Sequence, residues 1–221
     1  MIAVTLVVIA KAPVAGEAKT RLAVTVGERG AADIAAATLL DTLDAVDATP
    51  VQARVLALTG DLDQASSGTE IRSRLAGLFV VEQRGDDFSA RLANAIADAA
   101  AAAGARPVLL IASDTPQVTA DLLTECATAL LETDVVFGIA RDGGWWLLGV
   151  TDPAMAECLH TIPTSRSDTG AATLEALQDK GLAVTLVEEL SDVDTIDDVE
   201  SVRAACAPDS RFVLTTRAAG I

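Results

Sequence analysis

The sequence predicts an α/β fold in which helices cross over between the strands of a largely buried sheet. Short runs of apolar and β-branched residues, typical of strands covered on both faces, recur along the chain. Stretches of helical character lie between these runs, and this alternation is the pattern of a sheet with crossover helices. The chain has 221 residues, of which 51% are hydrophobic. This is enough apolar material for one core, and it argues against a disordered chain.

The first strand is predicted at Ala3–Ala10, because A-V-T-L-V-V-I-A is short, β-branched and almost entirely apolar. No basic segment precedes it, and the chain has no uninterrupted run of about 18 apolar residues, so we interpret it as a buried strand. Similar runs predict six further strands, at Val51–Leu58, Leu78–Glu82, Val108–Ala112, Asp134–Ala140, Trp145–Val150 and Ala183–Glu188.

The segments between the strands predict the helices Glu28–Val46, Glu70–Ala76, Phe88–Ala103, Thr119–Leu131, Ala154–Leu159, Asp168–Lys180 and Thr195–Cys206. Gly104-Ala105-Arg106-Pro107 ends one helix just before a strand, and Gly181 ends another. The sequence has neither a long Pro/Gly/Ser linker nor an internal repeat. We therefore predict one domain over residues 1–207, followed by a C-terminal tail, 208–221, to which we assign no element.

The charge balance of the chain is strongly acidic. Thirty-two Asp and Glu residues oppose 16 Lys and Arg residues, which gives a formal net charge of −16 and an isoelectric point near 4.3. Such a chain repels nucleic acid and anionic membrane surfaces, so we expect neither as a partner. Only three residues are lysine, and two of them, Lys11 and Lys19, share one loop with Arg21. This concentration of scarce cations indicates an anionic ligand.

Cysteine and histidine content argues against several kinds of site. The three cysteines are odd in number and form no CxxC pair, so we expect neither a disulfide framework nor a thiolate zinc site. A reducing, cytoplasmic location fits this pattern. The single histidine, His160, is expected at the surface after a short helix, which argues against His-based metal sites and Ser-His-Asp triads.

The loop after the first predicted strand reads K-A-P-V-A-G-E-A-K-T-R-L and spans Lys11–Leu22. It places two ammonium groups and a guanidinium around Gly16 and a helix start, an arrangement that suits a polyphosphate. The spacing between Gly16 and Lys19 does not match a Walker A loop. We favour phosphate binding, and the alternative is a solvated basic turn that balances nearby acids.

Two acidic segments follow predicted strands, at the ends where ligands of open α/β sheets bind. The fourth strand leads into S-D-T-P, in which Asp114 could hold Mg²⁺ or Mn²⁺, or could instead form an Asx turn or helix cap. The segment S-D-V-D-T-I-D-D-V offers two more carboxylates, Asp192 and Asp194. Thr195 in the same segment predicts a helix start.

The fifth predicted strand leads into R-D-G-G-W-W-L-L-G. Asp142 could accept hydrogen bonds from substrate hydroxyls, and Gly143 and Gly144 would let a backbone approach a ligand closely. Asp-Gly is also typical of a hairpin turn, and this alternative stays open. Trp145 and Trp146 lie on opposite faces if the segment is a strand, so we expect at most one of them to line a cleft and the other to pack.

Five motifs occur in one order between Val4 and Asp198: K-x-P-x-x-G-x-x-K-T-R-L, Q-x-G-D-x-x-x-x-R, S-D-T-P, D-G-G-W-W-L-L-G and D-V-D-T-x-D-D. This order resembles a group of microbial proteins with the GT-A fold of nucleotide-diphospho-sugar transferases, some of them linked to arsenosugar or selenium metabolism. It is similar at greater distance to phospholactate and molybdopterin cofactor guanylyltransferases. The resemblance implies a three-layer α/β/α sandwich with a mixed, mainly parallel sheet.

The resemblance also implies roles for particular residues of this chain. The implied nucleotide-binding residues are Lys11, Gly16, Lys19 and Arg21, the implied metal ligands are Asp114, Asp192 and Asp194, and the implied substrate-binding residues are Asp142, Gly143 and Gly144. Our own interpretation of the residues adds Trp145 to the substrate-binding set and makes Lys19, Arg21 and Asp114 the expected catalytic residues. Several positions depart from the family pattern and bear on acceptor identity and activity. They are Ile139, Arg141, which stands in place of an acid, Ser89, which stands in place of a glycine, and a tryptophan of the family that is missing near Pro163.

Together, the residues and the resemblance predict a transferase that uses a nucleotide, a small-molecule acceptor and Mg²⁺ or Mn²⁺. The basic loop suits a triphosphate, which favours nucleotidyl transfer from an NTP to a small phosphorylated acceptor with release of pyrophosphate. The naming of the family favours glycosyl transfer from a nucleotide-diphospho-sugar. A non-catalytic nucleotide-binding regulatory protein is a third alternative, compatible with Arg141 in place of an acid.

Overall fold

The computed structural model describes residues 1–104 and 107–221. Ala105 and Arg106, which belong to the predicted helix stop, lie outside the described residues. The strands are β1 (Ile2–Lys11), β2 (Val51–Thr59), β3 (Phe79–Glu82), β4 (Val108–Ala112), β5 (Val135–Ile139), β6 (Trp145–Val150) and β7 (Val184–Leu186). Each of them coincides with one of the predicted runs.

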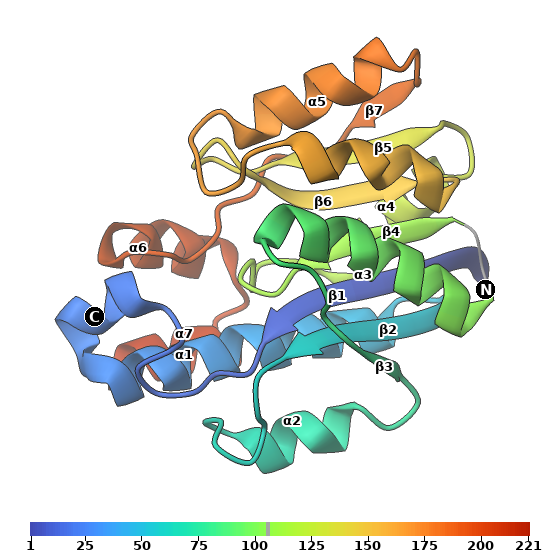
Figure 1. Ribbon diagram of the computed structural model, residues 1–221. Helices are drawn as coiled ribbons and strands as arrows, with labels where there is room; N and C mark the ends of the chain where they lie inside the picture. The colour runs from blue at the N-terminus through green and yellow to red at the C-terminus, as the bar shows by residue number, and fades with distance from the viewer. Residues whose placement is uncertain (105–106) are drawn as a thin grey trace.

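The described strands form one sheet in the order β3-β2-β1-β4-β6-β5-β7. Strand β6 runs antiparallel to both of its neighbours, β4 and β5, whereas the other neighbouring pairs are parallel. The expectation of a mixed, mainly parallel sheet is thus confirmed. The order also places β1 and β4, with their buried apolar residues, in the middle of the sheet, as Figure 1 shows.

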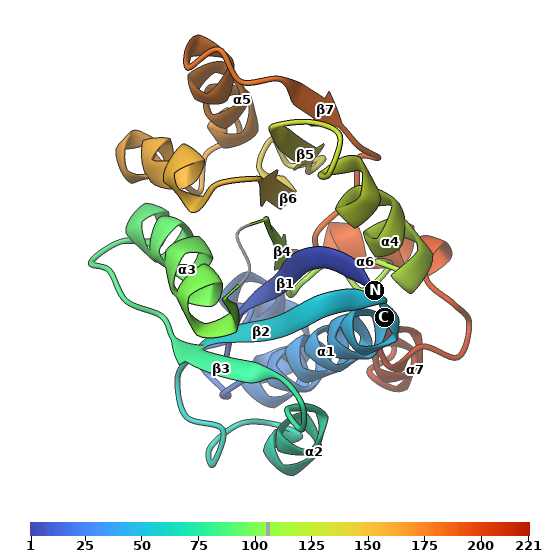
Figure 2. The ribbon, with the colours of Figure 1, turned by 90° about the vertical axis from the view of Figure 1, so that its right-hand side faces the viewer.

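The helices are α1 (Thr20–Ala48), α2 (Gly68–Arg74), α3 (Phe88–Ala103), α4 (Ala120–Ala129), the 3₁₀ helix η1 (Pro153–Thr161), α5 (Thr169–Asp179), α6 (Ile196–Ala205) and α7 (Arg211–Ala218). They pack on both faces of the sheet (Figure 2). One core cluster joins the sheet to α1, α2 and α4, and a second joins its other face to α3, η1 and α5. The predicted three-layer α/β/α sandwich is confirmed.

Strand β1 shows how the sequence builds both cores. Successive side chains of a strand point to opposite faces, so a strand covered on both sides needs apolar residues at every position. Leu6 and Val8 belong to the first core cluster, and Val7 and Ile9 belong to the second. The unbroken apolar run in the sequence is therefore the signature of a central strand.

Helix α1 begins earlier than the predicted helix Glu28–Val46, within the loop Lys11–Leu22, where a helix start was also expected. The prediction starts at Glu28, but the helix starts at Thr20 and is interrupted at Gly27, whose backbone is left-handed in φ (φ 76°, ψ 165°). Glycine is a poor helix former, and Gly27 hid the first two turns from sequence reasoning. This early segment is anchored by the fully buried Leu22. It matters for the site because it carries Arg21.

The C-terminal segment 208–221, to which the sequence assigned no element, contains helix α7. Phe212 of this helix is completely buried in a third apolar cluster with residues of α1 and α6. Arg211 pairs with Asp41, Asp44 and Glu70, so the start of α7 is also held to α1 and α2 by charge.

Among the described residues, no helix combines the length and the apolar character needed to cross a bilayer.

Candidate functional site

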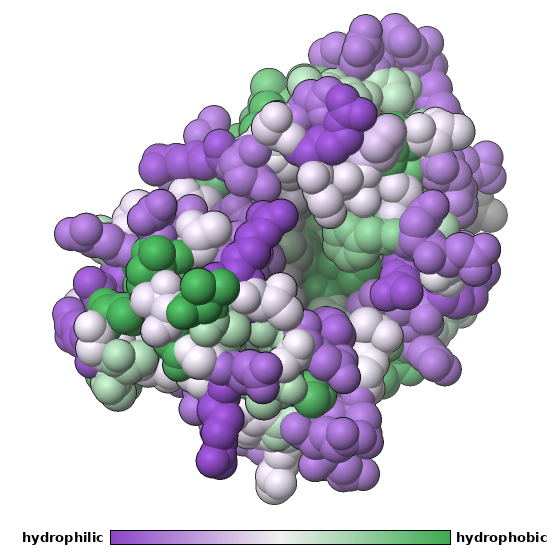
Figure 3. Space-filling view, turned by 60° about the vertical axis from the view of Figure 1, so that its left-hand side comes forward, coloured by the Kyte–Doolittle hydropathy of each residue, from purple (hydrophilic) through white to green (hydrophobic). Residues whose placement is uncertain are grey.

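Several polar segments meet at the carboxyl edge of the sheet. The loops after β1, β4 and β7 all reach this edge, because those strands run in the same direction. Strand β6 runs the other way, so the β5–β6 hairpin lies at the same edge. In Figure 3 this end of the molecule is hollowed, with hydrophobic residues at the bottom of the hollow and hydrophilic residues around it.

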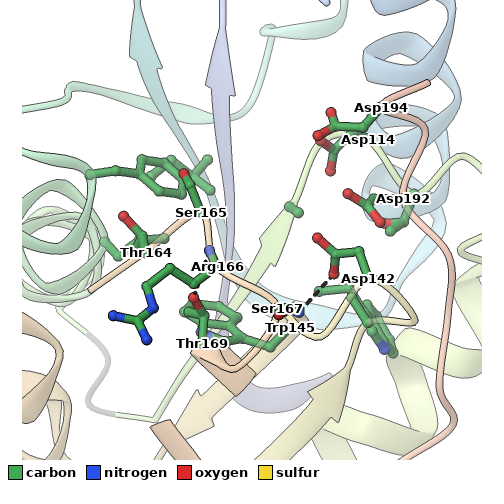
Figure 4. Close-up of a pocket in the computed structure, with 18 of the residues that line it drawn as sticks. Asp114, Asp142, Trp145, Thr164, Ser165, Arg166, Ser167, Thr169, Asp192 and Asp194 are labelled. Atoms are coloured by element: carbon green, nitrogen blue, oxygen red, sulfur yellow. Dashed lines mark hydrogen bonds between the residues drawn. The ribbon is translucent and has the colours of Figure 1, made fainter. Parts of the chain in front are cut away.

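Three aspartates form the acidic centre of this region. Asp114 follows β4, and Asp192 and Asp194 lie in the segment between β7 and α6. Each offers one carboxylate oxygen, and these three atoms lie within 4.8 Å of one another. Figure 4 shows the three side chains side by side on one flank of the cavity. The structure thus brings together all three of the metal ligands expected from the sequence.

Two hydrogen bonds hold the late acidic segment against the loop after β4. The backbone N–H of Val193 donates to the carbonyl oxygen of Asp114 at 3.1 Å. The side-chain amide of Gln117 donates to the carbonyl oxygen of Ser191 at 2.6 Å, and Gln117 is buried. The segment that carries Asp192 and Asp194 is therefore fixed by atoms close to Asp114.

The electrostatics of the three aspartates fit a divalent cation. Burial, together with the charges of Asp114, Asp142 and Asp194, raises the pKa of Asp192 to about 7. A carboxylate that resists ionisation in this way carries unbalanced negative potential around it, which a bound cation relieves. Carboxylate oxygens are the donors that Mg²⁺ and Mn²⁺ prefer. The donor set and its charge therefore suit either ion.

Lys19 lies inside this acidic group, and its partners are carboxylates. Its Nζ donates to Asp114 Oδ2 at 2.8 Å and to Asp194 Oδ1 at 3.1 Å, and its side chain is only 12% exposed. Burial alone would lower the pKa of Lys19, but the two aspartates outweigh it and raise the pKa to about 12. Arg21, which is mostly exposed, contacts the other oxygen of Asp194, with Nη1 and Oδ2 3.3 Å apart.

The remaining residues of the basic loop lie farther from the aspartates. Lys11 is exposed and pairs with Glu17, with 3.0 Å between Nζ and Oε2. Gly16 lies in a turn that faces Glu28. Its φ of +82° is a backbone conformation that favours glycine, and this explains the residue type at this position. Gly16 is not among the lining residues of the two cavities described next.

Two cavities of about 390 Å³ each adjoin the aspartates. We call the first the lysine pocket; its polar lining includes Lys11, Lys19, Thr20, Arg21, Gln83, Arg91 and Ser113. We call the second the tryptophan pocket; its polar and aromatic lining includes Asp142, Trp145, Thr164, Ser165, Arg166, Ser167, Thr169 and Asp192. Arg21, Asp114 and Asp194 line both cavities, so the acidic centre lies between them; Glu17 also lines the lysine pocket, whose described lining therefore holds four cations and three carboxylates.

The tryptophan pocket has two unlike flanks. Asp142 lies with the three aspartates on one side, and Thr164, Ser165 and Arg166 lie across the cavity (Figure 4). The guanidinium of Arg166 makes two hydrogen bonds of 2.9 Å to Asp168. Apolar side chains of the sheet and of α3 complete the lining: Ile9, Leu92 and Leu110.

The Asp-Gly-Gly segment forms a hairpin turn, as one of the two sequence interpretations predicts. Asp142 Oδ1 accepts a hydrogen bond of 2.7 Å from the backbone N–H of Gly144. Gly143 has a φ of +90°, and a Cβ there would lie 1.9 Å from the carbonyl oxygen of Ser167. The glycine is thus required for a close approach, but the approaching group is the chain before α5. Asp142 nevertheless lines the tryptophan pocket.

The two tryptophans behave differently, in line with the expectation for adjacent strand residues. Trp145 is partly exposed and its ring packs at 6.1 Å from that of Phe137. Trp146 borders the cavity but is only 1% exposed, and its Nε1 donates to the carbonyl oxygen of Glu188 at 2.9 Å. Trp145 is therefore the ring available to a ligand.

Sequence reasoning did not identify segment 164–167 as part of the site. Its residues, T-S-R-S, show no periodicity, and they reach the site only because η1 returns the chain to the carboxyl edge.

Two departures from the family pattern also have structural explanations. Ser89 Oγ donates to the carbonyl oxygen of Ile162 at 2.5 Å, and Arg141 pairs with Glu189 at 3.4 Å. Ile139 lies at a register shift between β5 and β6.

Solved structures share this fold. A candidate nucleotide-diphospho-sugar transferase from Desulfovibrio desulfuricans G20 is 24% identical with a TM-score of 0.83, over 99% of this chain and 95% of that chain. Rv0371c of Mycobacterium tuberculosis H37Rv, in complex with manganese, is 21% identical with a TM-score of 0.56, over 90% and 97%. The 4-diphosphocytidyl-2C-methyl-D-erythritol synthase of Anaerococcus prevotii DSM 20548 is 15% identical with a TM-score of 0.58, over 91% and 94%. At these identities the likeness is one of fold.

No curated protein matches the sequence. One family does match, that of the uncharacterized protein conserved in bacteria (DUF2064), over residues 42–166. This match covers 125 of the 221 residues and includes β2 to β6 with the S-D-T-P and D-G-G-W-W segments. The chain therefore belongs to the DUF2064 family and has the fold of the nucleotide-diphospho-sugar transferases.

Proposed function

We propose that this protein is a metal-dependent transferase that binds a nucleotide in the lysine pocket and an acceptor in the tryptophan pocket. One observation carries the proposal: the two cavities share Asp114, Asp194 and Arg21 as lining residues. Phosphates held at this shared wall would be reached by nucleotide-binding cations from one side and by an acceptor from the other. Several solved structures with this fold are named as transferases or synthases, and these names support the same class of activity.

The proposed division of labour follows from charge. Asp114, Asp192 and Asp194 would hold Mg²⁺ or Mn²⁺, which when bound supplies the positive charge that neutralises nucleotide phosphates. Lys11 and Arg21 are exposed cations beside the same cavity and would bind phosphate oxygens. At 4 Å and an effective dielectric constant near 20, each such contact is worth about 4 kcal/mol before desolvation. Chemistry of this kind needs positioning and charge rather than a protein nucleophile.

Nucleotidyl transfer is the reaction that we favour. The lysine pocket is lined by several cations, Lys11, Lys19, Arg21 and Arg91, which suits the extended charge of a triphosphate. In this reaction a phosphate oxygen of the acceptor attacks the α-phosphorus and forms a new P–O bond, while the bond from the α-phosphorus to the oxygen that bridges to the β-phosphorus breaks and pyrophosphate leaves with that oxygen. Related folds include a synthetase complexed with CTP and a nucleotidyl transferase from Methanothermobacter thermautotrophicus.

The acceptor is proposed to be a small phosphorylated molecule that lies in the tryptophan pocket. Its phosphate would bind on the flank of Thr164, Ser165 and Arg166, which lies across the cavity from the three metal-site aspartates and provides hydroxyl groups and a guanidinium that is paired with Asp168. Its apolar part would pack on Trp145. A cytoplasmic location, where such acceptors are made, is consistent with the three unpaired cysteines.

Glycosyl transfer from a nucleotide-diphospho-sugar is the second candidate. The carboxylate of Asp142 lines the tryptophan pocket and could accept a proton from an acceptor hydroxyl. The name of the structure from Desulfovibrio desulfuricans G20 points to the same chemistry. In this reaction the leaving group is a nucleoside diphosphate instead of pyrophosphate.

The test is product analysis with a panel of NTPs and nucleotide sugars in the presence of Mg²⁺. Release of pyrophosphate from one NTP supports nucleotidyl transfer, whereas release of a nucleoside diphosphate from a nucleotide sugar supports glycosyl transfer. Asp114→Ala should lower either rate at least a hundredfold, and Lys180→Met, an exposed residue beyond α5, should leave it unchanged. Unchanged turnover in Asp114→Ala would overturn the site assignment. Equal thermal stabilisation by every nucleotide without metal would favour a regulatory protein instead.

A further inference from the structure

Lys19 occupies the position between two of the three proposed metal ligands. Its Nζ lies 2.8 Å from Asp114 Oδ2 and 3.1 Å from Asp194 Oδ1, distances of charge-assisted hydrogen bonds. The side chain is 12% exposed, so these contacts are largely shielded from water. The ammonium therefore balances the charge of two carboxylates that a metal ion would also need.

A metal ion and this ammonium cannot both be well satisfied by the same two carboxylates. A carboxylate oxygen that accepts a short hydrogen bond from an ammonium has less electron density to offer a cation. A divalent ion within a few ångströms of a monovalent cation is also repelled by it. Arg21 is different, because its side chain is 70% exposed and contacts only the Asp194 oxygen that Lys19 does not use.

The lysine pocket can accommodate the Lys19 ammonium if a metal ion displaces it from the aspartates. Lys19 lines the lysine pocket together with Lys11 and Arg91, on the side proposed for nucleotide phosphates. A lysine ammonium is a compact charge on a flexible four-carbon stem, so it can turn from the aspartates into that cavity without a movement of the backbone.

We propose that Lys19 is a built-in counter-ion of the metal site. It holds Asp114 and Asp194 in place before a metal ion binds, it competes with the ion for them, and it turns toward the nucleotide phosphates when it is displaced. The last step rests on the proposed function, because it requires a bound nucleotide. One consequence is positive coupling between metal and nucleotide, since each ligand favours the position of Lys19 that the other needs.

The first test measures Mn²⁺ binding to the nucleotide-free protein by electron paramagnetic resonance. Lys19→Met should bind Mn²⁺ at least tenfold more tightly than the wild type, because the competitor is gone. Lys19→Arg, which keeps the charge, should bind close to wild-type affinity. Lys180→Met provides the matched control for loss of one lysine and should differ from the wild type by less than twofold. Circular dichroism of each variant shows whether it is folded.

The second test observes Lys19 directly. Only three lysines are present, so protein labelled with ¹³C at the lysine ε-carbons gives three resonances that single substitutions assign. Saturating Mg²⁺ should shift the Lys19 resonance and leave that of Lys180 in place. A Lys19 resonance that does not respond to bound Mg²⁺, or a Lys19→Met variant that binds Mn²⁺ no more tightly than the wild type, overturns the proposal.

Neither the Mn²⁺ affinity nor the Lys19 resonance depends on turnover. The counter-ion proposal and the transferase proposal can therefore be refuted independently of each other. Tighter Mn²⁺ binding by Lys19→Met in a protein that turns over no nucleotide would support the counter-ion and refute the transferase. Nucleotide turnover combined with unchanged Mn²⁺ affinity in Lys19→Met would do the reverse. Absence of Mn²⁺ binding by folded Lys19→Met would refute the counter-ion as well.

Discussion

At the residue scale, Asp192 links metal binding to pH. Its pKa is raised to about 7, first by burial and then by the charges of neighbouring aspartates, whereas an unfolded chain has a pKa near 3.9 at this side chain. A cation that binds Asp192 must displace its proton below pH 7. We therefore expect Mn²⁺ affinity to rise about tenfold per pH unit up to pH 7 and then to level off. Titrations with Mn²⁺ between pH 5.5 and pH 8.5 measure this, and a flat profile contradicts it.

The same shift predicts how the stability of the metal-free protein changes with pH. Because the folded state holds the proton of Asp192 more tightly than the unfolded state, this group contributes stability that is fully present below about pH 4. That contribution is lost as the pH rises through 7. Asp192→Asn resembles the protonated form at every pH. Thermal denaturation in EDTA should therefore show the wild type losing stability relative to Asp192→Asn between pH 4 and pH 7, and a constant difference would contradict the assigned pKa.

At the scale of elements, helix α7 is expected to contribute much of the stability of its end of the molecule. Phe212 is completely buried, whereas Leu214 on the same helix is 54% exposed. Phe212→Ala should lower the free energy of unfolding by about 3–5 kcal/mol, because it leaves a cavity among α1, α6 and α7. Leu214→Ala, the matched control, should change it by less than about 0.5 kcal/mol. Urea denaturation compares the two variants. If Phe212→Ala lowered the free energy of unfolding as little as Leu214→Ala does, α7 would not be part of the cooperative fold.

The elements also show which kinds of structure a single sequence predicts well. All strands of the described chain were predicted. The central strands are buried on both faces and need unbroken apolar runs, whereas the edge strands β3 and β7 are largely exposed and were recognised from short runs rich in β-branched and apolar residues. The first turns of α1 were missed because Gly27 interrupts the helical pattern. Helix α7 was missed because contacts distant in sequence stabilise it, such as Arg211 with Asp41. Local patterns predict an element only when local forces stabilise it.

At the scale of the whole molecule, the same limit applies to the site. Asp114 comes just after β4, Asp142 lies in the β5–β6 hairpin and Asp192 lies in the segment between β7 and α6, so their meeting at one edge could be predicted from the order of the elements. The partners of Lys19 could not, because Asp114 and Asp194 lie 95 and 175 residues away in sequence. The basic loop was interpreted as a phosphate site, and the structure adds that one of its lysines is held by the acidic centre.

The net charge of −16 makes a last prediction, about metal affinity and salt. A strongly acidic molecule attracts Mn²⁺ from a distance, and salt screens this attraction, since the Debye length falls from about 30 Å at 0.01 M to about 10 Å at 0.1 M. Affinity for Mn²⁺ should therefore fall several-fold between 0.01 M and 0.1 M KCl.

The same reasoning separates the local field from the distant one. Asp142→Asn removes a charge beside Asp192 and should weaken Mn²⁺ binding severalfold at 0.1 M KCl, where short-range interactions persist. A double variant of exposed residues at the opposite edge of the sheet, Asp47→Asn with Glu132→Gln, should change the affinity less than twofold there and measurably more at 0.01 M KCl. Equal effects of the near and distant substitutions at 0.1 M KCl would mean that net charge, rather than the arrangement of the four aspartates, determines how this protein binds its cation.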